Sequence, residues 1–224
     1  MTSQTDPTYG HRPRPGAAIW IAVGLVLLVA ALQGAWTAAW AAGGCIVLAL
    51  GPRAFTAVSG IVFPPGLGTG ILAYNAAALL LGEIAGFYVA LWWWDAALHL
   101  VASAVLSVVG MGIAMLATAG APPRTAVWVL AILAFGFSMM VGAMWELMEF
   151  SLDAAFGTVT QRSGLPDTMG DVAVNLVGGT LGAIAAHAHV SRGARWPLAG
   201  LLGRFMDQNP VIYPARERGR HAPR

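Results

Sequence analysis

Long apolar segments, joined by short polar or Gly/Pro-rich connections, make up most of this sequence. Residues 16–50, for example, contain no charged side chain, and Gln33 is their one amide. A helix needs about 20 apolar residues to cross the hydrocarbon core of a bilayer. The 224 residues are 58% apolar and 10% charged, with a mean hydropathy of +0.70, whereas soluble domains carry about 25% charged residues. This composition excludes an ordinary soluble domain, a disordered chain and a nucleic-acid-binding protein, and it predicts an all-α, polytopic membrane protein.

The apolar segments divide into about six membrane spans. The first long segment exceeds one span, and the Gln33-Gly34 pair is a natural break within it. We therefore expect a six-helix transmembrane domain over residues 16–190. The expected helices cover residues 16–33, 35–51, 70–93, 95–118, 125–152 and 169–189, with a polar loop over 153–168.

The basic residues predict the orientation of this bundle. All 12 are arginines, and six spans place eleven of them on one side, with only Arg162 on the other. The positive-inside rule makes the arginine-rich side cytoplasmic, so both termini are expected there. We expect residues 1–15 to be a disordered tail and residues 191–224 an Arg-rich tail. Within the latter, residues 196–205 form either a short helix on anionic membrane lipids or a loose solvated segment. A cleaved signal peptide at the first helix is the alternative to six spans.

The acidic residues gather on the opposite side. With this topology the cytoplasmic side carries a net charge of +8 and the outer side −6. Residues three or four apart share one face of a helix, which groups these side chains into stripes at three helix ends. The stripes are Asp95 with His99, Glu146 with Glu149 and Asp153, and Asp167 with Asp171 and Asn175, while Glu83 is expected nearer mid-membrane.

These stripes predict a shared cation site. Carboxylates within a membrane are costly without a positive partner, and Arg162 is the one basic residue on that side, so the compensating charge is expected from a bound cation or from protons held by the acids. Oxygen ligands with one imidazole suit a divalent metal cation. The candidate metal ligands are Asp95, His99, Glu146, Glu149, Asp167 and Asp171, with Glu83 and Asn175 as further polar residues. Alternatively, Asp95, Asp167 and Asp171 are only helix caps, and His99 is only a packed interfacial residue.

Several of these polar residues also resemble a known family. The segments Leu81-Gly82-Glu83, Trp92-Trp93-Trp94-Asp95 and Leu98-His99 resemble the YjdF-like family of bacterial inner-membrane proteins. So do Trp145-Glu146 with Glu149-Phe150, Gly157-Thr158 with Gln161, and Asp167-Thr168 with Asp171. The chain is more distantly similar to VanZ-like proteins. The resemblance implies a multi-pass protein of the bacterial cytoplasmic membrane in which these polar positions matter, and it assigns no reaction.

Three classes of function are compatible with this pattern. The first is a metal-dependent hydrolase or transferase acting on a lipid-linked substrate, in which His99, Glu146 or Glu149 serves as general base. The second is a proton or cation transporter with Glu83 as a relay at mid-depth. The third is a structural or accessory membrane subunit. The sequence leaves the oligomeric state open.

Overall fold

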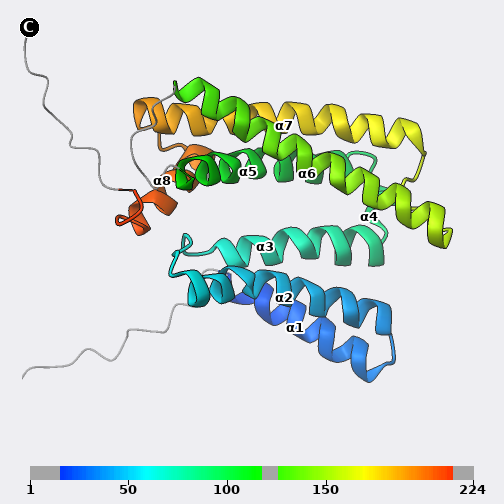
Figure 1. Ribbon diagram of the computed structural model, residues 1–224. Coiled ribbons are helices and arrows are strands. Elements are labelled where there is room, and N and C mark those ends of the chain that lie inside the picture. Colours follow the sequence, from blue (N-terminus) through cyan, green and yellow to red (C-terminus); the bar gives the residue numbers. More distant parts are fainter. Residues whose placement is uncertain (1–15, 118–125, 214–224) are drawn as a thin grey trace, which may run out of the picture.

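The computed structural model describes residues 16–117 and 126–213, which form a helical protein without β-strands (Figure 1). This confirms the expected all-α class. The predicted N-terminal tail, the helix ends expected at 118 and 125, and residues 214–224 of the predicted C-terminal tail lie outside the described residues. The elements are α1 Ala17–Leu32, α2 Trp36–Ser59, α3 Leu67–Asn75, the π-helix η1 Ala76–Ile84, α4 Phe87–Ala90, α5 Trp94–Leu116, α6 Val127–Phe156, α7 Leu165–Arg192 and α8 Pro197–Gln208.

The helices form two groups that lie side by side (Figure 1). One group contains α1, α2 and α3 with its continuation η1, and its core surrounds the fully buried Cys45 and Leu72. The other contains α5, α6, α7 and α8, with Met111 and Leu202 at its centre. The Trp94 indole of α5 joins the groups, because its Nε1 donates to the carbonyl of Ala77 in η1 at 3.2 Å.

Within residues 16–117 and 126–213, five helical segments are long and apolar enough to cross a membrane by length and composition: Trp36–Ser59, Leu67–Ile84, Trp94–Leu116, Val127–Phe156 and Leu165–Arg192. The first helix, α1, has 16 residues and is about 24 Å long, compared with about 30 Å for a bilayer core. The chain is thus built as a multi-pass membrane protein, and a sixth span through α1 stays a prediction. The cytoplasmic location of both termini also stays a prediction.

The second helix is longer than expected. We predicted an end at residue 51, before Pro52 and Arg53, but α2 continues through Pro52 to Ser59. Proline removes one backbone donor and usually interrupts a helix. Here the Thr56 hydroxyl donates to the carbonyl of Pro52 at 2.9 Å, which supports the following turn. Arg53 consequently lies on a helix, 5.9 Å from the centre of the Trp20 ring, and not in a connector.

The third span ends earlier than expected. We predicted one helix over 70–93, but η1 ends at Ile84, and Gly86 turns the chain with φ +77°. The Tyr88 ring packs directly against the Cα of Gly82, so the chain folds back on itself. The prediction that Glu83 lies near mid-membrane is therefore wrong, because the residue is next to last in its helix.

The connection between α6 and α7 is shorter than predicted. The expected loop over 153–168 shrinks to residues 157–164, because α6 continues to Phe156 and α7 begins at Leu165. Asp153 and Asp167 consequently lie within the two helices.

Helix α8 packs against α5 and α7. Leu202 is 2% exposed, and Gly203 contacts the imidazole of His189. Just after α8, the Tyr213 hydroxyl donates to the carbonyl of Gly112 at 3.0 Å. Of the two alternatives for this part of the tail, the loose segment is therefore wrong.

Candidate metal site

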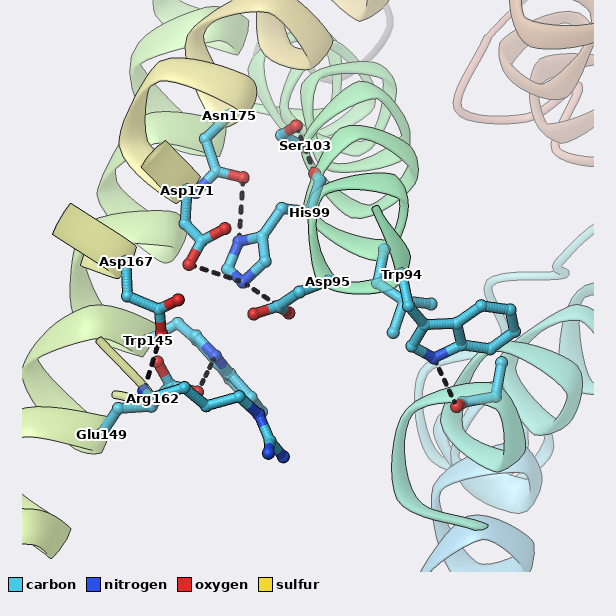
Figure 2. A network of polar contacts seen from close by, with 12 residues as sticks. Trp94, Asp95, His99, Ser103, Trp145, Glu149, Arg162, Asp167, Asp171 and Asn175 are labelled. Atoms are coloured by element: carbon cyan, nitrogen blue, oxygen red, sulfur yellow. Dashed lines mark hydrogen bonds and ion pairs between the residues drawn. The ribbon is translucent and has the colours of Figure 1, made fainter. Parts of the chain in front are cut away.

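The candidate site lies where α5 and α7 begin and α6 ends (Figure 2). Further along both helices, close packing of α5 against α7 fixes how the two helices are aligned. Gly178 contacts the Ser103 hydroxyl and the backbone of Leu100, and Gly182 contacts the backbone of Ala104. Such small residues let membrane helices approach closely. With the two helices this close, His99 on α5 lies beside Asp171 and Asn175 on α7.

His99 occupies the centre of the cluster. Its Nε2 lies 3.6 Å from Asp95 Oδ1 and 3.9 Å from Asp171 Oδ2. Its Nδ1 lies 3.3 Å from Asn175 Oδ1, and the pair forms a hydrogen bond. An amide oxygen only accepts, so Nδ1 carries the proton of this bond. Figure 2 shows Nε2 facing the two carboxylates.

This geometry fits a shared cation. Two ligand atoms about 2.1 Å from one ion are at most about 4.2 Å apart, and both distances from Nε2 fall within that limit. One ligand atom from each of Asp95, His99 and Asp171 lies within 4.8 Å of the others. Without an ion, Nε2 interacts favourably with the carboxylates only where a proton lies between them, either on the imidazole or on a carboxyl group. The arrangement is therefore suited either to a divalent cation or to a shared proton.

The cluster is largely shielded from solvent by protein. Asp171 is 6% exposed and Asn175 2%, while the His99 side chain is 12% exposed. The more open Asp95 side chain, at 32%, lies at the entrance. Burial increases the cost of an uncompensated carboxylate, so the two acids need a positive partner or a proton at this place.

Glu146 lies close by, on α6. It is 5% exposed, and neither carboxylate oxygen has a hydrogen bond of normal geometry among the described residues. It is near enough to His99, Asp171 and Asp95 to interact electrostatically, and the Thr168 hydroxyl is a further close neighbour. Thr168 is itself bound by Gln161, whose Nε2 donates to it at 2.6 Å.

Glu149 and Asp167, two of the predicted ligands, lie outside the three-residue cluster. Glu149 accepts a hydrogen bond from Trp145 Nε1 at 3.0 Å and is half-buried at the rim. Asp167 accepts from the backbone N–H of Arg162 at 3.0 Å, so its carboxylate shapes the loop before α7. Asp153 has a similar role, since it accepts from the Thr160 backbone N–H at 2.8 Å.

Glu83 is separated from the cluster by its own partner. Its carboxylate lies 3.1 Å from the Arg162 guanidinium, which also stacks 4.9 Å from the centre of the Tyr88 ring. The pKa of Tyr88 is raised, first by burial and then by the charge of Asp95, so this phenol remains neutral at ordinary pH. Sequence reasoning did not assign Trp145 or Tyr88 to the site. The i,i+4 spacing of Trp145 and Glu149 was an available signal, whereas Tyr88 reaches the site only through the turn at Gly86.

A comparison with protein-family models matches residues 16–192 to a family described as "Predicted membrane protein (DUF2238)". No curated protein and no solved structure matches the chain. The match covers all the candidate site residues, and it carries no evidence for the more distant similarity to VanZ-like proteins.

Proposed function

We propose that this chain, which belongs to the DUF2238 (YjdF) family of predicted membrane proteins, is a metal-binding membrane protein. In this proposal Asp95, His99 and Asp171 hold one divalent cation. The observation that carries it is the position of His99 Nε2, which faces two carboxylates at 3.6 and 3.9 Å without a hydrogen bond. We propose a bacterial cytoplasmic membrane as its location, with the site on the outer side.

The proposed chemistry is hydrolysis or transfer on a lipid-linked substrate. His99 is then a ligand, and Glu149 at the rim is the carboxylate placed to act as general base. In hydrolysis, the oxygen of water forms the new bond to the substrate while the bond to the leaving group breaks. Glu149 takes the proton of the water and returns it to the leaving group. Asp95, His99 and Asp171 would hold the cation, and when bound it would supply Lewis-acid polarisation of the attacked group.

Apolar side chains around the site support a lipid-linked substrate. Trp92, Phe156 and Leu165 stand just before α5, at the end of α6 and at the start of α7, and they are 91%, 76% and 73% exposed. Exposed tryptophan and other large apolar side chains are typical of the membrane interface. A substrate with an apolar tail could therefore approach the cluster from the bilayer.

The transporter hypothesis lacks the mid-depth proton relay that it requires. It required Glu83 at mid-depth, but Glu83 lies at a helix end and pairs with Arg162. An accessory subunit with a purely structural polar cluster remains the competing outcome of the experiment below.

Metal analysis of the purified full chain in detergent tests the proposal. We expect bound divalent metal after dialysis against metal-free buffer, and its loss in His99→Ala and Asp171→Asn. Asp207→Asn is the matched control, because Asp207 lies on α8 with a 58% exposed side chain. A folded wild-type protein that binds no divalent metal, or an Asp171→Asn protein that binds it as tightly as the control, would contradict the proposal.

A further inference from the structure

Glu146 is a buried polar residue whose position is not explained by the cluster of Asp95, His99 and Asp171. Its carboxylate is buried and interacts electrostatically with the cluster, and among the described residues no hydrogen bond of normal geometry reaches either oxygen, although the Thr168 hydroxyl is a close neighbour. Leaving a buried carboxylate unsatisfied is expensive, and native structures rarely retain one without a partner. A cation bound to this carboxylate would supply such a partner.

One ion at the centre of the cluster does not take up Glu146. Asp95, His99 and Asp171 each bring a ligand atom within 4.8 Å of the other two, but Glu146 does not join that set. It nevertheless interacts electrostatically with all three. Glu146 therefore lies outside the set of ligands expected for the first ion, yet close enough for its charge to interact with theirs.

The charges at this end of the bundle also exceed one divalent ion. Five carboxylates are electrostatic neighbours: Asp95, Glu146, Glu149, Asp167 and Asp171. If all are ionised, one divalent ion leaves three negative charges, and a second ion leaves one. Arg162 interacts electrostatically with Asp95, but it supplies one positive charge and its guanidinium is shared with Glu83 at 3.1 Å.

We propose that the site is binuclear, with Glu146 as the ligand that holds a second divalent cation next to the first. This inference rests on the proposed function, because it adds an ion to the same site. Two-metal sites keep their ions about 3.5–4 Å apart and share carboxylates, and they typically act on phosphate esters by stabilising both the attacking and the leaving oxygen. The substrate class is accordingly a lipid-linked phosphate or diphosphate ester.

Titration of the metal-free full chain with Mn²⁺ tests this inference. We expect two Mn²⁺ per wild-type chain and one in Glu146→Gln, whose remaining ion is held by Asp95, His99 and Asp171. Glu83→Gln is the matched control, because Glu83 is exposed and paired with Arg162, and it keeps two ions. Electron paramagnetic resonance of the saturated wild-type protein gives a second readout that needs no variant: two adjacent Mn²⁺ ions produce a spin-coupled spectrum.

The outcomes separate the two proposals. A wild-type chain that binds one Mn²⁺ with an uncoupled spectrum, and a Glu146→Gln chain that binds the same, would overturn the binuclear site and leave the mononuclear one intact. That result would mean that Glu146 simply holds a proton. A folded wild-type chain that binds no Mn²⁺ would overturn the proposed function itself.

Discussion

Replacing Asn175 with alanine tests whether His99 is oriented for metal binding. Asn175 is 2% exposed, and its Oδ1 holds His99 Nδ1 at 3.3 Å. A partner of this kind fixes the tautomer and direction of a metal-binding imidazole, and its loss typically lowers metal affinity 10–100-fold. That range corresponds to about 1.4–2.7 kcal/mol of binding free energy.

We expect Asn175→Ala to weaken divalent-metal binding by this factor, measured by competition with a chelator of known affinity. Asn175→Asp keeps an acceptor for Nδ1 and should retain affinity within about threefold or increase it. Thr180→Ala, an exposed site on the same helix, is the control. If Asn175→Ala is folded and binds metal as tightly as Thr180→Ala, the role assigned to the His99–Asn175 bond is wrong.

Three further predictions concern stability, each measured by thermal unfolding in detergent. A Gly182→Ala side chain would collide with the backbone of Ala104 and cost about 1–3 kcal/mol, whereas Gly170→Ala has open space and should be neutral or stabilise the helix by up to about 1 kcal/mol; equal effects would contradict the close α5–α7 contact. Tyr213→Phe removes the hydrogen bond from the hydroxyl to the Gly112 carbonyl and should cost about 0.5–1.5 kcal/mol, and an unchanged melting temperature would contradict the hydrogen bond that joins this segment to α5. Because the raised pKa of Tyr88 favours its neutral form in the folded protein, stability should fall as pH rises above about 10, and Tyr88→Phe should reduce that fall; an unaltered alkaline profile would argue against a buried phenol.

The sequence predicted the structure best where a single requirement decided it, namely that the backbone of a membrane span must satisfy its own hydrogen bonds. Apolar segments must form helices in a bilayer, which is why the helical class and most spans were predictable. The meeting of His99 with Asp171 and Asn175 also followed from helix spacing, since α5 and α7 begin at the same end of the bundle. Polar side chains in membrane helices turn toward one another because lipid offers them no partner.

The predictions from the sequence differ from the structure where contacts between particular side chains and the backbone decide the local conformation. The third span ends at Ile84 because Gly86 turns the chain and Tyr88 packs on Gly82, a tertiary contact that hydropathy cannot register. Asp167, a predicted ligand, instead accepts a hydrogen bond from the loop backbone at Arg162. Acidic residues beside a loop serve caps and sites equally well, so spacing alone did not separate these roles.

In the proposed site, His99 Nε2 and one oxygen from each of Asp95 and Asp171 surround a divalent cation. An anomalous difference map from crystals of the full chain grown with Mn²⁺ measures this directly. We expect a peak about 2.0–2.4 Å from these three atoms. A map without a peak there, with His99 instead hydrogen-bonded to both carboxylates as an imidazolium, would contradict it.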